Sequence, residues 1–310
     1  MEPRYEAMNY RRCGRSGLLM SEISLGFWHN FGKDADPDNC RAIVEYAFDH
    51  GITCFDLANN YGPPPGSAEV LFGGIMKKSL STHRDEIVIT TKAGHDMWPG
   101  PYGEWGSRKN LMASLDQSLK RMGLDYVDIF YSHRPDPETP LEETMQALVD
   151  IVRAGKALYV GISKYPPEMA EKAYRYLKEA HTPCLVYQGR LNMLERGPEE
   201  VIIKQAEDNG AGFVAFSPLA QGLLTDRYLN GIPDGSRMTH SRFLRPEVLT
   251  DSLLEQLKEW NRTACGSGMT LAQYALKWVL DHQNVASVII GASSVGQLKS
   301  NLEICGRVLR

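Results

Sequence analysis

The chain is best interpreted outward from one segment, Cys54-Phe55-Asp56-Leu57-Ala58-Asn59-Asn60-Tyr61-Gly62. Ile52 to Phe55 has the composition of a short buried strand, and Asp56 stands where that strand should end. Tyr61 follows five residues later, in a loop broken by Gly62 and three prolines. A carboxylate at a strand end beside a phenol is a weak signal alone, so the neighbouring segments decide what it means.

The next two strand-like runs also end at a titratable side chain. Lys92 follows Ile87 to Thr91, and His133 follows Val127 to Ser132. In a parallel barrel the carboxyl ends of the strands open onto one face, where catalytic groups gather. We therefore expect Lys92 and His133 to converge with Asp56 and Tyr61.

Strand-like and helix-like segments alternate along almost the whole chain. A hairpin over residues 8–20 comes first, with a glycine-rich turn. Eight strand-like runs follow, at about residues 23–26, 52–55, 87–92, 126–132, 158–162, 184–187, 212–216 and 285–290. Helical periodicity separates them, for example over about 67–80 and 199–209. This pattern predicts a (β/α)8 TIM barrel whose bottom is closed by the N-terminal β-hairpin, with residues 1–310 as a single domain.

Composition excludes several classes of protein. The chain has 310 residues, 43% of them hydrophobic, and a formal net charge of -4, which argues against an extended nucleic-acid surface. No apolar run approaches the roughly 20 residues that span a bilayer, and residues 1–12 lack a signal-peptide core. The six cysteines form no C-x-x-C pair, so free thiols in a reducing, cytoplasmic compartment are expected.

The four convergent side chains suit proton donation to a carbonyl group. A free phenol has a pKa near 10, and a close ammonium is expected to lower the pKa of Tyr61. Asp56 can pair with Lys92, and His133 can orient the carbonyl oxygen. No side chain is redox-active, so a hydride would come from a bound cofactor. The histidines lack metal-ligand spacing, and no metal site is predicted.

Each residue also has a bland interpretation. Asp56 can be a loop or helix-capping carboxylate, and Tyr61 can be a half-buried loop aromatic. Lys92 can extend to the surface, and His133 can be a hydrogen-bonded core histidine. A class I aldolase is a further alternative, because a lysine at a barrel strand end can form a Schiff base.

At these residues the sequence resembles the aldo-keto reductases. The matching motifs are Asp56-x4-Tyr61, Thr90-Thr91-Lys92, Ser132-His133-Arg134-Pro135-Asp136, Gly161-Ile162-Ser163, Phe216-Ser217-Pro218-Leu219 and Ile290-Gly291-Ala292-Ser293. Within the family the chain is most similar to the bacterial L-glyceraldehyde 3-phosphate reductases and the potassium-channel β subunits. The segments at 96–103 and 219–225 favour the reductases.

The resemblance implies NADPH-dependent reduction of small aldehydes, with L-glyceraldehyde 3-phosphate and methylglyoxal as candidates. Asp56, Tyr61, Lys92 and His133 would be the catalytic tetrad, with Tyr61 as general acid. A homo-oligomer, either a tetramer or an octamer, is also implied. The alternative within the family is a cofactor-binding accessory subunit of a potassium channel with little turnover. His133 counts against it, because those subunits tend to have asparagine there.

The resemblance also implies a map of the cofactor site. Ser163 and Gln188 would bind the nicotinamide carboxamide, Phe216 would stack on the ring, and Trp28 and Asp56 would lie beside its ribose. The remaining contacts, to the pyrophosphate and the adenosine phosphate end, would come from Ser217, Leu219, Gln221, Arg227, Arg237, Gly291, Ser293, Gln297 and Asn301.

Two long loops complete the expected site. The loop at 93–106 carries Trp98, Tyr102 and Trp105, which are expected to wall the substrate pocket. The loop at 218–250 is rich in arginine, at positions 227, 237, 242 and 245. The sequence departs from the family pattern at Leu191, at Ser300, and at Arg310, where it ends without the closing helix and tail of its relatives.

Overall fold

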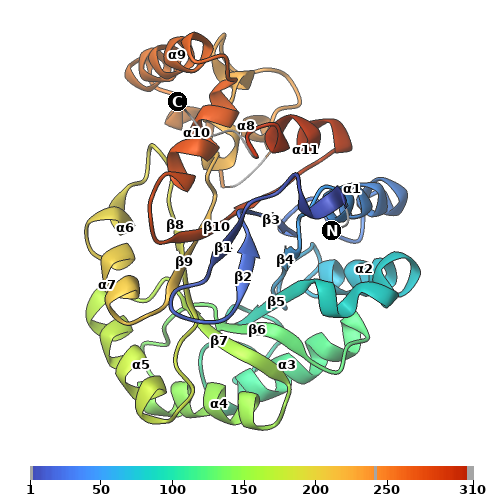
Figure 1. Cartoon of the computed structure of the whole chain (residues 1–310), viewed down its shortest axis with the longest axis vertical. Coiled ribbons are helices and arrows are strands. Elements are labelled where there is room, and N and C mark those ends of the chain that lie inside the picture. The colour runs from blue at the N-terminus through green and yellow to red at the C-terminus, as the bar shows by residue number, and fades with distance from the viewer. Residues whose placement is uncertain (1–2, 241–242, 306–310) are drawn as a thin grey trace.

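The computed structural model describes residues 3–240 and 243–305. Within these ranges eight parallel strands close into a barrel in the order β10-β3-β4-β5-β6-β7-β8-β9. Strand β10 closes the ring because it pairs with both neighbours, Val288 lying opposite Ile23 of β3 and opposite Ala215 of β9. Figure 1 shows the strands surrounded by helices, with the hairpin of β1 and β2 across one end. The predicted (β/α)8 barrel is therefore confirmed.

The elements follow one another as strand and helix around the ring. The strands are β1 Tyr10–Arg12, β2 Leu19–Ser21, β3 Ile23–Gly26, β4 Cys54–Asp56, β5 Val88–Ala93, β6 Val127–Ser132, β7 Ala157–Ser163, β8 Val186–Arg190, β9 Gly212–Phe216 and β10 Val285–Ile290. The helices are α1 Pro37–Asp49, α2 Ser67–Ile75, α3 Arg108–Met122, α4 Leu141–Arg153, α5 Pro167–Glu179, α6 Gly197–Glu200, α7 Ile202–Asp208, α8 Arg237–His240, α9 Asp251–Gly266, α10 Leu271–Leu280 and α11 Val295–Leu302.

Two predicted helices differ from their expected form. The segment at 67–80 is α2 up to Ile75 and then widens into a π-helical turn, Met76–Leu80. The segment at 199–209 is interrupted at Val201, whose φ of -125° and ψ of -54° separate α6 from α7. A β-branched side chain favours such a departure from helical geometry.

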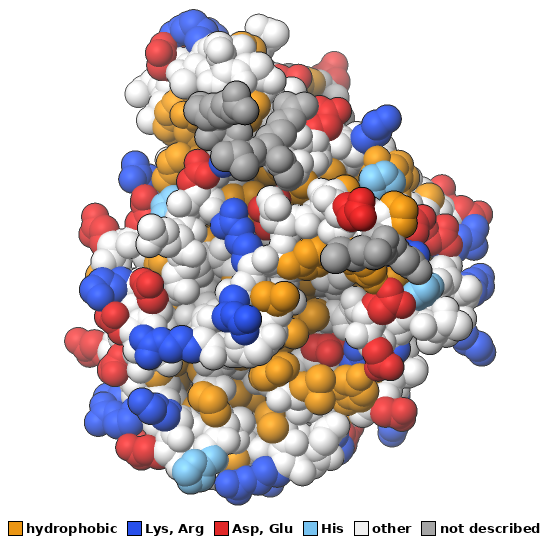
Figure 2. Space-filling view, viewed as in Figure 1, with side chains coloured by type: hydrophobic (Ala, Val, Ile, Leu, Met, Phe, Trp, Pro, Cys, Tyr) orange, Lys and Arg blue, Asp and Glu red, His pale blue; other side chains and the backbone are white. Residues whose placement is uncertain are grey.

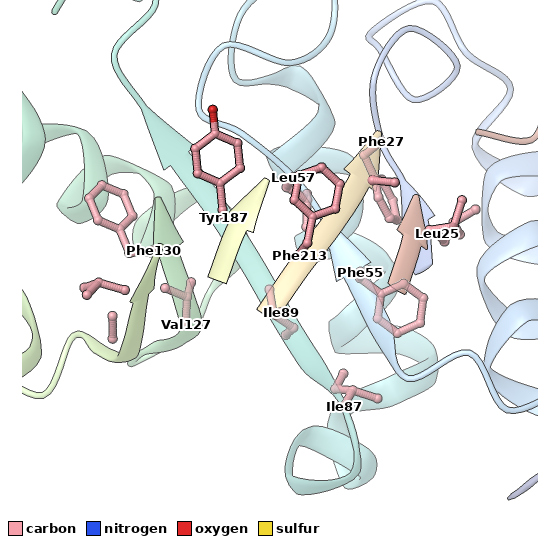
Figure 3. Packing of buried hydrophobic residues seen from close by; sticks show 14 of the residues in the cluster. Leu25, Phe27, Phe55, Leu57, Ile87, Ile89, Val127, Phe130, Tyr187 and Phe213 are labelled. Atoms are coloured by element: carbon pink, nitrogen blue, oxygen red, sulfur yellow. The ribbon is translucent and has the colours of Figure 1, made fainter. Parts of the chain in front are cut away.

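The main hydrophobic core lies between the strands and the surrounding helices. The ring of Phe27 is 5.1 Å from that of Phe72 on α2 and 6.3 Å from that of Phe55 on β4. Figure 3 shows Leu25, Phe27, Phe55 and Leu57 packed in this layer. Burial of these large side chains fixes the helices against the barrel wall.

The lumen of the barrel changes character from one end to the other. Because alternate strand residues share a face, Cys54 lies on the same face as Asp56, and Val88 on the same face as Lys92. Near the N-terminal ends of the strands a second buried cluster includes Cys54, Val88, Ile129 and Val214. The polar residues on the same strand faces, Asp56 and Lys92, lie at the C-terminal ends of the strands. The two-residue period of the strands thus places the titratable groups at one mouth.

The hairpin seals the opposite end. Its residues Cys13 and Met20 belong to the same buried cluster, and the amide of Arg15 donates to the carbonyl of Gly210 at 2.9 Å. Gly14 has a φ of +56°, and a Cβ there would lie 2.3 Å from the carbonyl oxygen of Gly210. Only glycine fits this close approach, so the predicted closure by the hairpin is confirmed.

Charged side chains are dispersed over the surface. Figure 2 shows basic and acidic groups interspersed on the hairpin side rather than gathered by sign. All six cysteines lie within the described ranges and are free thiols, as expected. None of the helices seen in residues 3–240 and 243–305 is long and apolar enough to cross a membrane.

Candidate active site

The four predicted catalytic residues meet at the C-terminal mouth of the barrel. Asp56 is the last residue of β4, Lys92 is the penultimate residue of β5, and His133 follows β6 directly. These three side chains are buried, whereas Tyr61, on the loop between β4 and α2, is partly exposed. The four side chains therefore lie at one mouth, as the sequence pattern predicts, and their part in catalysis stays a prediction.

Asp56 is the centre of a buried hydrogen-bond network. Its Oδ2 accepts from Lys92 Nζ at 2.7 Å, and its Oδ1 accepts from Thr90 Oγ1 at 2.7 Å and from Gln188 Nε2 at 2.9 Å. Lys92 also donates to the carbonyl of Leu57 at 2.6 Å. Burial lowers the pKa of Lys92, and the ion pair with Asp56 opposes that shift. The carboxylate therefore holds the ammonium inside the barrel.

Tyr61 lies against this pair, but its acidity differs from the sequence-based expectation. The Nζ atom of Lys92 is 5.0 Å from the centre of the Tyr61 ring. Although the Tyr61 side chain is partly exposed, desolvation of its hydroxyl group, followed by the negative charge of Asp56, raises its pKa well above 10. The expected lowering of the Tyr61 pKa is wrong, because desolvation of the phenolate and the nearby carboxylate of Asp56 both favour the protonated phenol. Tyr61 is thus fully protonated near pH 7, the form that a general acid requires.

His133 is held as a neutral imidazole. Its ring is edge-on to Tyr61, with the ring centres 5.9 Å apart. Burial lowers its pKa well below 6.5, and the positive charges of Lys92 and Lys164 lower it further. Its Nδ1 is buried and has no hydrogen-bond partner among the residues the structure describes. The ring can therefore interact with a substrate oxygen at the mouth.

The residues expected to hold a nicotinamide join the same mouth. Ser163 ends β7 opposite Gln188 of β8, and Gln188 is bonded directly to Asp56. Phe216 ends β9 and is partly exposed. The buried Oγ of Ser163 has no partner within residues 3–240 and 243–305. A buried hydroxyl without a partner is unfavourable, and a carboxamide group could supply the missing hydrogen bond to Ser163.

The other expected cofactor residues lie on three segments around the mouth. Trp28 follows β3, and its ring is 5.3 Å from that of Phe243. Gln221 donates through Nε2 to the Phe243 carbonyl at 3.0 Å, while its Oε1 is buried with no described partner. The remaining members of the loop after β9 are Ser217, whose carbonyl accepts from Asn192 at 3.0 Å, and Leu219, which is partly buried.

The segment after β10 forms a further polar group. Gly291 and Ser293 are exposed, and the Ser293 amide donates to Gln297 Oε1 at 2.9 Å. Asn301 on α11 is buried, and its Nδ2 has no partner in the described part of the chain. The donors and acceptors of Ser163, Gln221 and Asn301 thus fit a long polar ligand such as a dinucleotide.

The arginine-rich loop supplies positive charge to this side. Arg237 is partly buried at the start of α8, and burial together with nearby Arg227 lowers its pKa. Arg227 is exposed on a short 3-10 turn, Asp226–Tyr228. Arg242 lies outside the described residues. Two neighbouring guanidinium groups are suited to a phosphate.

Comparison with known proteins agrees with this geometry. The model of the aldo/keto reductase family matches residues 22–310. The chain is an aldo/keto reductase. The resemblance seen in the sequence motifs is thereby confirmed, and so is the assignment as an oxidoreductase.

Two kinds of known protein share much of the sequence. The chain is 54% identical to the L-glyceraldehyde 3-phosphate reductase of Escherichia coli (strain K12), over 97% of this chain and 88% of that protein. It is 35% identical to a probable voltage-gated potassium channel subunit beta of Arabidopsis thaliana, over 96% of this chain and 90% of that protein. A similar protein of Oryza sativa subsp. japonica is 34% identical, with the same coverage.

Several contacts at the mouth of this aldo/keto reductase were missed by the sequence reasoning. The hydrogen bond from Thr90 to Asp56 was not predicted. The two-residue period of the strand could have indicated it, because Thr90 lies on the same face of β5 as Lys92. Trp105 lies on the guanidinium of Arg134, 3.7 Å from its carbon. Tyr102 is exposed beside Lys109 of α3, and its expected part in the substrate pocket stays a prediction.

Proposed function

We propose that this aldo/keto reductase reduces small aldehydes with NADPH and that Tyr61 donates the proton. The convergence of Asp56, Tyr61, Lys92 and His133 at one mouth carries this proposal. The similarity to a protein named L-glyceraldehyde 3-phosphate reductase makes that aldehyde the first candidate, with methylglyoxal as a second.

Each side chain has a distinct part in this chemistry. NADPH, when bound, would supply the hydride. Asp56 holds Lys92 inside the barrel, and the ammonium stabilises the phenolate that forms as Tyr61 gives up its proton. The neutral ring of His133 orients the carbonyl oxygen toward the Tyr61 hydroxyl. The high pKa of the resting phenol makes this nearby cation necessary, since otherwise proton release would be unfavourable.

The cofactor side of the proposal rests on the unsatisfied polar atoms. Ser163 and Gln188 would hold the carboxamide, Phe216 would cover the nicotinamide, and Asn301 would bind the adenosine end. Arg237 and Arg227 favour NADPH over NADH because the extra 2′-phosphate suits arginine.

Two other functions are less compatible with the geometry. A Schiff-base aldolase requires a free amine, whereas Lys92 is fully buried and bonded to Asp56 and to the Leu57 carbonyl. An accessory subunit would retain the cofactor residues without needing a complete set of proton-transfer groups. Borohydride trapping tests the first alternative, and turnover on an aldehyde panel tests the second.

The decisive variant is Tyr61→Phe, with Tyr126→Phe, directly before the N-terminal end of β6, as the matched control. Loss of the proton donor is expected to reduce kcat by about 10²–10⁴-fold, with NADPH binding nearly unchanged. Absorbance of NADPH follows turnover, and its fluorescence follows binding. Undiminished kcat in Tyr61→Phe would refute the assigned general acid. Tight binding without turnover in the unmodified protein would refute the reductase.

A further inference from the structure

Lys164 has an unusual backbone conformation at the edge of the proposed active site. It follows Ser163, the last residue of β7, and its φ of +62° lies in the left-handed region. For a residue with a Cβ this costs about 1–2 kcal/mol, and such strain concentrates at functional sites. The turn leaves Ser163 buried and Lys164 exposed at the mouth.

The ammonium of Lys164 lies close to the catalytic groups. Its Nζ is 3.3 Å from Nε2 of His95 and 5.8 Å from the centre of the Phe216 ring. His95 in turn meets His133 edge-on, with ring centres 4.5 Å apart. Burial and the charges of Lys164 and Arg134 lower the pKa of His95 to about 4. His95 is therefore neutral, and its Nε2 can accept a hydrogen bond from Lys164.

The three other cations whose charges act on Lys164 are each paired with a carboxylate. Lys92 pairs with Asp56, Arg134 with Glu104, and Arg190 with Glu195. Lys164, by contrast, forms no ion pair with any carboxylate in residues 3–240 and 243–305. Among these four cations Lys164 is thus the member without a carboxylate partner in the described residues, and it lies beside the proposed substrate position.

The surroundings make this charge unfavourable in the absence of an anion. Although the side chain of Lys164 retains contact with solvent, desolvation of its ammonium, followed by the positive charges of Lys92, Arg190 and Arg134, lowers its pKa to about 8. Near pH 7 the ammonium is still mostly protonated, but it is repelled from several directions. An anion bound at the mouth would relieve that repulsion.

We propose that Lys164 binds the phosphate of the substrate and so selects phosphorylated aldehydes over neutral ones. This inference rests on the proposed reductase function and adds the group that recognises the charged end of the substrate. A cofactor phosphate has the same chemistry. The substrate is favoured because Lys164 reaches toward His95 and His133, whereas the loop expected to hold the pyrophosphate follows a different strand, β9.

The test compares two substrates that differ only by the phosphate, glyceraldehyde 3-phosphate and glyceraldehyde. In Lys164→Gln the ratio of their kcat/KM values should fall roughly 10- to 100-fold, as for loss of a charge-assisted hydrogen bond. Lys164→Arg should retain most of the ratio, and Lys172→Gln on the exposed face of α5 should retain all of it. In the unmodified protein the ratio should also fall as pH rises through about 8, while Lys164→Arg should remove that fall.

Other results would overturn the inference. An unchanged ratio in Lys164→Gln would show that the residue does not recognise the phosphate. A weaker NADPH affinity with an unchanged ratio would assign Lys164 to the cofactor. If the unmodified protein reduces neither aldehyde, the proposed function fails, and calorimetry of glyceraldehyde 3-phosphate binding then decides this inference. Weaker binding in Lys164→Gln supports it, whereas equal or undetectable binding in both proteins contradicts it.

Discussion

The carboxylate of Asp56 has two structural roles, as an ion-pair partner and as a hydrogen-bond acceptor. It neutralises Lys92, and it also fixes Thr90 and Gln188 from two other strands. A buried ion pair is tolerated when its remaining hydrogen-bonding positions are filled in this way. The geometry around Tyr61 is therefore set before any ligand arrives.

His133 should make the stability of the protein depend on pH. Its pKa is lower in the folded chain than the ordinary 6.5, so the unfolded chain binds more protons between these two values. Stability is then present above about pH 6.5 and is lost as pH falls below it, by at most about 1.4 kcal/mol per pH unit. In His133→Asn this part of the slope should disappear.

Urea unfolding between about pH 5 and pH 7 measures the effect. His181→Asn is the matched control, because His181 is exposed and already has a left-handed φ of 58°, which asparagine tolerates. A slope in His133→Asn as steep as in the control would contradict the prediction.

At the scale of elements, Glu69 joins three of them. It is fully buried on α2 and accepts from Thr91 Oγ1 of β5 at 2.6 Å and from Arg121 Nε of α3 at 2.7 Å. Glu69→Gln removes the charge that Arg121 faces and should lower the free energy of unfolding by about 3–5 kcal/mol. Glu259→Gln, which breaks an exposed pair with Arg262 on α9, should cost less than about 1 kcal/mol. Chemical denaturation gives both values, and similar losses would count against a special role for Glu69.

The loop after β9 should determine the choice of cofactor. Arg237→Ala should weaken NADPH binding by about 1.5–3 kcal/mol, because a charge-assisted hydrogen bond to the 2′-phosphate is lost. NADH, which lacks that phosphate, should be affected much less. Fluorescence titration with both cofactors measures the difference, and Arg245→Ala, at an exposed position of the same loop, is the control. Equal losses for NADPH and NADH would place the phosphate contact elsewhere.

The loops and side-chain acidities were the least predictable parts of the site. Gln221 adopts a φ of 59° and bonds to Phe243, 22 residues away, so no local pattern indicates its position. The pKa of Tyr61 depends on how completely the surrounding protein excludes water, which residue spacing does not express. Lys164 stands next to a predicted residue, but only its contacts with His95 and the lack of a described carboxylate partner mark it as unusual.

At the scale of the whole molecule, the barrel and the tetrad were predictable for a common reason. Strand and helix periods are local properties, and eight repeats of them restrict the possible topologies to very few. Once the strands are parallel, a residue at the end of each run must face the same mouth. Asp56, Lys92 and His133 are therefore located by topology alone, and Tyr61 by its short distance from Asp56.

The closed end of the barrel has a consequence for how ligands bind and dissociate. Gly14 packs on the backbone of Gly210 with no room for a side chain, and Cys13 and Met20 fill the lumen above it. In the described part of the chain the hairpin closes one end of the barrel, so Tyr61 is reached from the opposite mouth. Under the proposed function a cofactor and an aldehyde share this mouth, so the molecule bound deeper would leave only after the other has dissociated. The hairpin, far from any reacting atom, would thereby fix the order in which the two molecules bind and dissociate at the opposite end.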